Sequence, residues 1–280
     1  MRTNLSAAAI IAKTAKWAVL LFFLVFTFLP LLWLFITSFK TNFELLTSPL
    51  SLPATWQFQN YINAFQLSDL HLLFVHSVLV SFLSMGLNIL VASMAAYVLS
   101  RYHFGFNNVI LSILLAGILI PIIALMVPYF KLISRSGLYD SLMALILTYA
   151  AINIPISVFL IHGFMGAIPK ELEEAAVIDG CSFLQRYSRI ILPLSKLGIV
   201  TAGTFVFLYS WNEFIYALLL TSSVRARTLQ LGIRFFKSQF VSDYTSMYAA
   251  LVITIIPSIL VYVLLHDKII QGLTSGALKG

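Results

Sequence analysis

The densest group of charged side chains in this 280-residue chain lies between residues 167 and 193. Four of the ten acidic residues fall within nine positions there, namely Glu171, Glu173, Glu174 and Asp179. Acidic side chains near the start of a helix are favoured by the helix dipole, so this pattern predicts a short helix that begins with carboxylates. A helix of about 15 Å cannot cross a bilayer and must lie against the membrane or a partner protein.

That first helix is predicted to begin at Pro169, which suits a first helical position, and to end at Gly180, which readily adopts a left-handed conformation. Residues three and four positions apart share one face of a helix. One face therefore carries Leu172, Ala175, Ala176 and Asp179, with the other acids turned away. The two alanines would leave a shallow surface on which side chains of another protein could seat. An ordinary solvated loop is the equally weighted alternative.

A second short helix is predicted to follow at once. Ser182 and Gln185 have the spacing of a capping box, in which each side chain bonds to the backbone of the other residue. Arg186 and Arg189 favour the C-terminal end of this helix, and Pro193 is expected to stop it.

Glu213 is the second candidate, because it is the one acidic residue deep in a predicted membrane span. An ionisable side chain at that depth usually faces the interior of a bundle or a wet cavity. Together with Trp211, Asn212 and Tyr216, it could offer hydrogen bonds and an aromatic surface to a molecule on a translocation path through the bundle. A polar clamp between helices, or a position nearer the membrane interface, is an equal alternative.

Motifs for catalysis are absent from the sequence. It contains no phosphate-binding loop with Gly-Lys-Ser/Thr, no His-Glu-x-x-His and no Gly-x-Ser-x-Gly, so we expect neither ATP hydrolysis nor hydrolase chemistry from this chain. The five histidines are scattered, and the single cysteine, Cys181, excludes an internal disulfide. We therefore expect no catalytic residue, no metal and no cofactor in this chain.

The overall composition is that of an integral membrane protein. Apolar residues make up 60% of the chain and charged residues 10%, whereas soluble domains have roughly 45–50% and about 25%. The net charge of +7 is spread thinly, which favours contact with lipid headgroups over nucleic-acid binding. Since alternating strand patterns are missing, the predicted fold class is all-α and polytopic.

Charge-free stretches locate six predicted transmembrane helices, because about 20 apolar residues cross a bilayer and charges there are unfavourable. They cover residues 17–37, 74–99, 109–130, 142–164, 197–220 and 247–266. The stretch 45–68 is excluded because it is rich in proline and amide side chains. The prediction is a six-helix domain over 17–266 that carries the polar segment 167–193, preceded by an N-terminal segment at 1–16 and followed by a polar tail at 267–280.

Basic residues favour internal termini only weakly. With both termini inside, ten lysines and arginines lie in internal segments and seven in external loops. Four of those seven belong to one loop, namely Arg225, Arg227, Arg234 and Lys237. Contact with lipid headgroups is one explanation for that loop.

Prolines and glycines mark further positions of interest. Four predicted spans contain a proline that can kink the helix, namely Pro30, Pro121, Pro155 and Pro257. A fixed bend is favoured over a moving hinge, because proline is common in membrane helices. Gly272, Gly276 and Gly280 have GxxxG spacing, but they lie in the predicted polar tail, so membrane dimerisation through them is not expected.

The segment 167–193 also carries a known signature. Glu174-Ala175-Ala176, Gly180 and, nine residues later, Ile190-x-Leu192-Pro193 match every fixed position of the EAA signature, and the chain therefore resembles permease subunits of binding-protein-dependent ABC importers. Asp179, the 211–214 stretch and the terminus at 272–280 are similar to the carbohydrate (maltose-type) branch of that family. The resemblance extends from the first predicted span to the last residue.

The resemblance implies that the EAA segment forms a coupling helix on the cytoplasmic side, where it docks on an ATPase subunit. The implied ATPase-coupling residues are Glu174, Ala175, Ala176, Asp179, Gly180, Ile190, Leu192 and Pro193. The implied partners are a homologous permease subunit, two copies of a cytoplasmic ABC ATPase that bind ATP and magnesium, and an extracytoplasmic solute-binding protein that the basic loop would face. The implied location is a bacterial-type inner membrane with both termini in the cytoplasm and the tail near the ATPase.

The expected function is therefore half of a translocation path for a sugar or oligosaccharide, driven by ATP hydrolysis in partner subunits. A self-sufficient ion-coupled secondary transporter is the alternative, although only Glu213 could carry its protons or sodium ions. An intramembrane enzyme would need a convergent set of catalytic residues that the sequence does not contain.

Overall fold

The computed structural model describes residues 7–67, 69–233 and 243–277, which are helical or lie in turns and loops, with no strand among them. These residues form two units, one of residues 7–67 and 243–253 and the other of residues 69–233 and 254–277. The long helix α15 (Tyr244–Ala277) contributes to both. The helical fold confirms the class predicted from the sequence.

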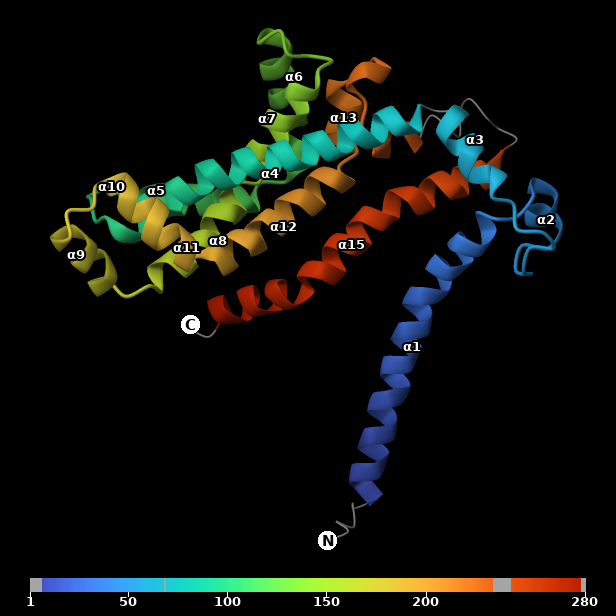
Figure 1. The fold of residues 1–280 in the computed structure, drawn as a ribbon, viewed down its shortest axis with the longest axis horizontal. Coiled ribbons are helices and arrows are strands. Elements are labelled where there is room, and N and C mark those ends of the chain that lie inside the picture. Colours follow the sequence, from blue (N-terminus) through green and yellow to red (C-terminus); the bar gives the residue numbers. More distant parts are fainter. Residues whose placement is uncertain (1–6, 68, 234–242, 278–280) are drawn as a thin grey trace. The chain divides into compact units, whose positions relative to one another are not determined.

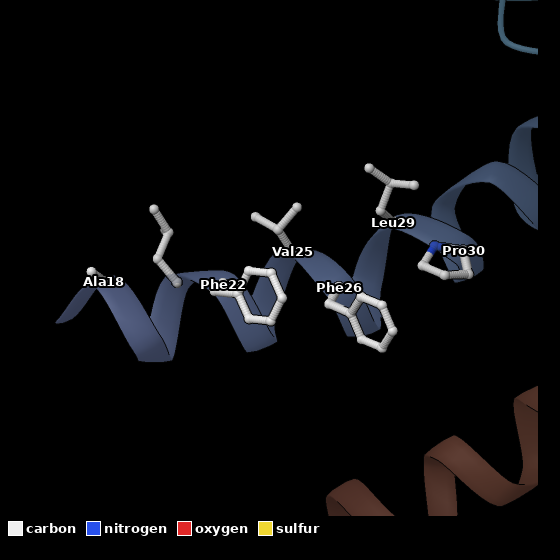
Figure 2. A pocket seen from close by; sticks show the side chains of 7 residues that line it. Ala18, Phe22, Val25, Phe26, Leu29 and Pro30 are labelled. Atoms are coloured by element: carbon white, nitrogen blue, oxygen red, sulfur yellow. The ribbon is translucent and has the colours of Figure 1, made fainter. Parts of the chain in front are cut away.

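The first unit begins with α1 (Ala7–Thr37), a helix of 31 residues. Its residues 12–37 are apolar enough to cross a membrane in one segment, and their most apolar window has no buried residue. Figure 2 shows seven apolar side chains along α1, among them Phe22 and Phe26, whose rings stack at 6.0 Å. A helix that is apolar on all sides and this exposed is typical of a membrane span.

The chain after α1 forms two short helices, α2 (Asn42–Thr47) and α3 (Gln59–Leu67). A capping box starts α2, in which Thr41 and Glu44 bond to each other's backbone. The charge-free stretch 45–68 is therefore not a continuous helix in its described part, as its prolines and amides predicted.

Lys40 is fully buried within this unit. Its ammonium group donates hydrogen bonds of 2.9 Å to the carbonyl oxygens of both Ser48 and Pro49. The amide of Asn60 donates to the carbonyl oxygens of Ser38 and Lys40 at 2.9 and 2.8 Å. A buried ammonium group is unfavourable unless its donors are satisfied, so these carbonyls fix the path of the loop around Lys40.

The second unit is built around α4 (Leu70–Arg101), which contacts α7, α8 and α12. The other main helices of this unit are α5 (Asn107–Ala116), α6 (Met126–Arg135), α7 (Leu142–Ile152), α8 (Ile154–Gly166), α12 (Lys196–Asn212) and α13 (Ile215–Leu220). Figure 1 shows α4 and α12 running side by side. Asn88 of α4 donates a 2.8 Å hydrogen bond to the carbonyl oxygen of Ala150 in α7. Hydrogen bonds between helices help to hold membrane bundles together.

The buried core of this unit lies where α4, α8 and α12 meet the segment after α10 (Phe183–Arg186). Its members are Ala92, Ala96, Tyr97, Leu99, Val158, Ile161, Met165, Tyr187, Ile191 and Ala202. The alanines let the helix backbones approach closely, and the aromatic rings fill the space at the end. This core supports the polar segment that the sequence analysis singled out.

Three of the six predicted spans are not straight, continuous helices. The span 109–130 turns through 101° near Pro121, and the span 142–164 bends by 47° between α7 and α8. Proline lacks the N–H group that continues a helix, and Pro155 lies in the first turn of α8. With each bent pair counted as one span, the described residues contain up to six candidate spans.

The predicted span 197–220 is the third that is not one continuous helix. It is broken between α12 and α13, because Glu213 has an extended backbone conformation. Neither proline nor glycine lies at this break, so the apolar pattern gave no sign of it. Before α12, the chain turns by 78° from the helical segment 183–194.

The predicted polar tail at 267–280 is a continuation of α15 as far as Ala277. Gly272 packs against α12 so closely that a methyl group at this position would overlap with the Thr201 side chain. Thr201 also donates a 3.3 Å hydrogen bond to the carbonyl oxygen of Lys268. The glycine thus serves helix packing within this chain, while Gly280 lies outside the described residues.

Asp140 joins the start of α7 to the loop that follows α13. It has a left-handed backbone with φ of 59°, and its carboxylate accepts backbone hydrogen bonds from Ser222 at 2.7 Å and Ser223 at 2.8 Å. Its own N–H donates to the carbonyl oxygen of Leu220 at 2.9 Å. The two backbone hydrogen bonds to the carboxylate, that from Ser222 first, lower the pKa of Asp140 below its ordinary value.

Replacing Asp140 with asparagine is expected to lower the Tm of the purified protein by about 2–4 °C, the equivalent of roughly 1 kcal/mol. Asparagine tolerates the left-handed backbone but loses the charge, and solvent screening keeps the effect small at this half-exposed site. Because the folded pKa of Asp140 is lowered, its contribution is complete above the unfolded pKa of about 3.9 and is lost as the pH falls through the folded pKa. Thermal unfolding of the wild type and of Asp140→Asn is measured at pH 7 and at a pH below about 4. An equal difference in Tm between the two proteins at both pH values would contradict the prediction.

Candidate functional site

The segment 167–193 contains the short helix α9 (Glu171–Ile178). This helix begins two residues later than predicted, with Lys170 before its first turn and three glutamates within that turn. Gly180 has φ of 78°, and the N–H groups of Gly180 and Cys181 donate to the carbonyl oxygens of Val177 and Ala176 at 3.0 and 2.9 Å. The predicted left-handed glycine at the end of the helix is therefore confirmed.

The second predicted helix is correct at its start and ends within one residue of Pro193, but its middle is not a regular α-helix. Ser182 and Gln185 form the predicted capping box at the start of α10. The chain then forms a π-helical turn at Tyr187–Ile191 and a last helical turn, α11 (Leu192–Leu194). Pro193 lies in α11, and the helical segment ends at Leu194, one residue later, since proline has no N–H group with which to continue the helix.

The face of α9 that was predicted to receive a partner is only partly open. Only Glu173 and Ala176 are buried, whereas Leu172, Val177 and Ile178 are exposed, Ile178 by 86%. The prediction that Ala176 belongs to an open docking surface is wrong, as is the prediction that Glu173 turns away. The exposed residues of α9 and its C-terminal turn are Glu171, Leu172, Glu174, Ala175, Val177, Ile178, Asp179 and Gly180.

The C-terminal half of the EAA signature lies elsewhere. Ile190 and Leu192 are half-buried and pack against the core of the second unit, whereas Pro193 is exposed. These two apolar residues hold the segment onto the bundle. Of the predicted coupling residues, the structure thus leaves Glu174, Ala175, Asp179 and Gly180 exposed together at one end of the unit (Figure 1).

A cluster around Glu173 was missed by the sequence analysis. Its carboxylate lies 3.1 Å from Nε of Arg101 and 3.6 Å from Nη1 of Arg186, and it accepts a hydrogen bond from the hydroxyl group of Tyr97. Arg101 is the last residue of α4. Its pairing with an acid 72 positions later has no signal in a single sequence.

Glu213 is buried in the gap between α12 and α13. Its carboxylate accepts hydrogen bonds from the hydroxyl group of Tyr149 at 2.6 Å and from the N–H groups of Tyr216 and Ala217 at 2.8 and 3.1 Å. It therefore caps the first turn of α13 and ties it to α7. Of the alternatives for Glu213, these contacts match the polar clamp between helices.

A cavity of about 420 Å³ adjoins this clamp. Asn212, Glu213 and Tyr216 line it together with Tyr209 and other residues. Asn212 is exposed and its amide lies 3.4 Å from the hydroxyl group of Ser258, whereas the hydroxyl group of Tyr216 donates to the carbonyl oxygen of Ile122 at 2.8 Å. The structure thus brings three of the four path candidates to one cavity.

Trp211, the fourth path candidate, lies away from this cavity. It is buried, its indole N–H donates to the carbonyl oxygen of Thr254 at 3.0 Å, and its ring packs against Phe74 and Phe207. It holds α12 and α15 together and has no free aromatic face for a passing molecule.

The basic loop is only partly described. Arg225 is exposed, and Arg227 donates a 2.6 Å hydrogen bond to the carbonyl oxygen of Ser222. Arg234 and Lys237 lie outside the described residues. Within the described part of the chain, no group of three or more His, Cys, Asp or Glu side chains could hold a metal ion.

The sequence of this chain is similar to those of known transport proteins. Residues 88–275 match the family described as binding-protein-dependent transport system inner membrane component. The sulfoquinovosyl glycerol transport system permease protein of Agrobacterium fabrum is 36% identical over 90% of this chain and 88% of its own length. The trehalose/maltose transport system permease protein of Thermococcus litoralis is 33% identical over 90% of this chain and 91% of its own length.

A solved structure shares the fold. A chain of a bacterial ABC transporter involved in the import of the acidic polysaccharide alginate superposes with a TM-score of 0.84, at 20% identity, over 94% of this chain and 98% of that chain. The family match contains the whole EAA segment and both sides of the Glu213 break. The resemblance inferred from the EAA signature is confirmed: this chain belongs to the family of binding-protein-dependent transport system inner membrane components, the permease subunits of ABC importers.

Proposed function

We propose that this permease subunit forms half of the import path for a sugar or oligosaccharide and that α9 couples it to a cytoplasmic ATPase. Two relatives whose names specify glycosides or disaccharides align over 90% of this chain, which supports a carbohydrate substrate. Membership in an importer family disfavours the self-sufficient secondary transporter. The buried hydrogen bonds of Glu213 count against it too, because that carboxylate is already occupied as a clamp.

The observation that carries the coupling role is the exposed apolar edge of α9. Val177 and Ile178 are 52% and 86% exposed, on a helix that lies between predicted spans and carries the EAA signature. Exposed apolar side chains grouped outside a membrane are typical of a protein contact. Glu174 and Asp179 flank this edge and add charge that can orient a partner.

The proposed assembly contains this chain, a homologous permease subunit, two ATPase subunits that bind ATP with magnesium, and an extracytoplasmic binding protein. Such an assembly places α9 and both termini on the cytoplasmic side of the inner membrane. This chain carries no ATPase motif, so it acts as a transport subunit while the assembled complex hydrolyses ATP. Closure of the ATPase pair would tilt the bundle between inward-open and outward-open arrangements.

The cavity beside Glu213 is the proposed part of the translocation path in this chain. Asn212 offers an exposed amide, and half-buried Tyr209 contributes an aromatic ring to the wall, while Tyr216 lies fully buried behind it. Sugar-binding sites commonly combine a flat apolar surface with a few directed polar groups. In this proposal Asn212 contacts the passing molecule, and Glu213 holds the wall in place.

Replacing Ile178 with aspartate tests the coupling role. The change puts a charge into the proposed docking surface, so we expect the ATPase to co-purify at least about tenfold less, equivalent to the loss of a contact worth about 1.4 kcal/mol. His103→Asp is the matched control, because His103 is exposed in the loop after α4, close in sequence to Arg101 at the same end of the unit. The assignment is overturned if Ile178→Asp retains the ATPase as the control does.

Uptake by the reconstituted complex tests the substrate class. Proteoliposomes with both permease subunits, the ATPase and the binding protein are supplied with labelled trehalose, maltose or diacetylchitobiose, and with labelled amino acids as the contrasting class. ATP-dependent uptake of a sugar alone supports the proposal. ATP-dependent uptake of an amino acid, or uptake by the permease alone along an ion gradient, contradicts it.

A further inference from the structure

Glu173 differs from every other acid in the coupling segment because it faces the bundle. Its side chain is 10% exposed, whereas Glu171, Glu174 and Asp179 are exposed. Ala176 is the one other buried residue of α9, and its methyl group offers little contact area. Of the side chains of α9, the carboxylate of Glu173 therefore makes the main contact with the rest of the protein.

The groups around that carboxylate, one hydrogen-bond donor and two guanidinium groups that pair with its charge, come from two other helices. Tyr97 and Arg101 lie in the last turns of α4, and Arg186 is the last residue of α10. The ring of Tyr97 packs against Phe183 and Tyr187 at centroid distances of 5.1 and 5.4 Å. The side chains of Arg101 and Glu173 are 3% and 10% exposed, and a charged hydrogen bond is stronger and more directional in such a site.

Arg101 also holds the chain that leads into α9. Its Nη1 donates a 2.8 Å hydrogen bond to the carbonyl oxygen of Ile168, and its Nη2 reaches that of Pro169 at 3.5 Å. A planar guanidinium group can bind several acceptors at once in fixed directions. One residue at the end of α4 therefore fixes both the approach to α9 and its first turn.

The helix that receives this attachment extends through the second unit. It has 32 residues and contacts α7, α8 and α12, and Figure 1 shows α9 beyond the end of α4 that carries Arg101. A movement imposed on α9 is thus delivered directly to the central helix of the bundle. A purely apolar contact would allow α9 to slide along α4. Here the hydrogen bonds of Tyr97 to Glu173 and of Arg101 to Ile168 have fixed directions.

The geometry points to Glu173 as a positioning residue that locks α9 to α4, so that both move as one body when the ATPase acts. This inference rests on the proposed coupling role of α9 and goes beyond it, since it assigns the internal attachment and not the docking surface. Removal of the Glu173 charge is expected to leave the ATPase bound but poorly coupled. Coupling between two sites typically changes binding affinity about 5- to 150-fold, and we expect the stimulated ATPase activity to fall by a factor within this range, about tenfold.

The direct test measures the distance between α9 and α4. Spin labels are placed at Glu171→Cys, an exposed position outside the proposed docking edge, and at exposed Val98→Cys, in a Cys181→Ser background of the assembled transporter. With Glu173 present, we expect one narrow distance that ATP does not change. With Glu173→Gln, we expect a broader distribution that ATP shifts. Equal and narrow distributions in both proteins would overturn the inference.

The functional test uses stimulated ATPase activity. The binding protein is saturated with a mixture of trehalose, maltose and diacetylchitobiose, and Glu173→Gln is expected to lower the maximal stimulated rate about tenfold without changing the half-saturating concentration of binding protein. Glu171→Gln removes the same charge from an exposed position of the same helix and should behave as wild type. Tyr97→Phe keeps the ring contacts and removes one donor, so it should give an intermediate loss and remains informative if Glu173→Gln folds poorly.

Two results would refute the lock by different routes. An equal loss in Glu171→Gln would show that the charge of α9 matters and not its buried contact. Loss of ATPase co-purification in Glu173→Gln would place this residue in the docking surface. Failure of the ATPase to bind the wild-type permease at all would instead refute the proposed coupling role, and the label distances would still report on the lock.

Discussion

Replacing Gly180 with proline is expected to abolish ATP-dependent uptake while the chain still inserts into the membrane. Gly180 has φ of 78°, whereas proline fixes φ near −65° and lacks the N–H group that bonds to Val177. The turn after α9 must then change its course, which displaces the proposed docking surface. Uptake into proteoliposomes and binding-protein-stimulated ATP hydrolysis are the measurements.

Gly180→Ala is the graded control for this prediction. No neighbouring atom lies within 4 Å of the position that a methyl group would take, so only the left-handed backbone opposes it, by about 1–2 kcal/mol. A partial loss of ATP-dependent uptake is therefore expected.

Glu174→Lys should also abolish coupled hydrolysis, because it reverses an exposed charge in the first turn of α9. Normal transport by Gly180→Pro and Glu174→Lys would show that this segment does not couple the ATPase.

Replacing Glu213 with alanine is expected to reduce the yield of folded protein severely. The hydroxyl group of Tyr149 and the N–H groups of Tyr216 and Ala217 would lose their acceptor in a buried site. Each buried group left unsatisfied destabilises by about 1–3 kcal/mol. Size-exclusion profiles and Tm in detergent give the measurement, and an unchanged Tm would rule out the clamp.

Asn212→Ala provides the contrast to Glu213→Ala. Asn212 lies at the same cavity but is exposed and caps no helix. We expect its loss to leave Tm within about 2 °C, since exposed substitutions usually change stability by less than 0.5 kcal/mol. If uptake falls in this variant at unchanged Tm, the cavity lies on the path. If uptake is unchanged, the assignment of Asn212 to the path is wrong.

Local sequence signals predicted the local structure well. Ser182 and Gln185 form their capping box, and Gly180 takes the left-handed conformation, because both depend on residues within four positions. The apolar runs likewise identified the helices that are long enough to span a membrane. The EAA signature identified the family for the same reason, since its fixed residues lie close together in the chain.

Features that depend on distant residues escaped the sequence. The burial of Glu173 requires Arg101 and Tyr97 from a helix 70 or more positions earlier, and a glutamate in a first helical turn is equally compatible with exposure. The break at Glu213 was missed since apolar residues continue on both sides of it. Pro121 indicated a bend, but the turn of 101° depends on how α5 and α6 pack.

The buried ammonium group of Lys40 affects how the membrane topology of this chain can be mapped. Reagents that modify amines and cannot cross a bilayer need an accessible, unbonded amine, and Lys40 is fully buried with hydrogen bonds to two carbonyl oxygens. Lys40 will therefore stay unmodified from either side of an intact vesicle. The absence of modification at Lys40 therefore does not indicate which compartment its loop faces. A cysteine introduced at exposed Leu52 is a better labelling site for that loop.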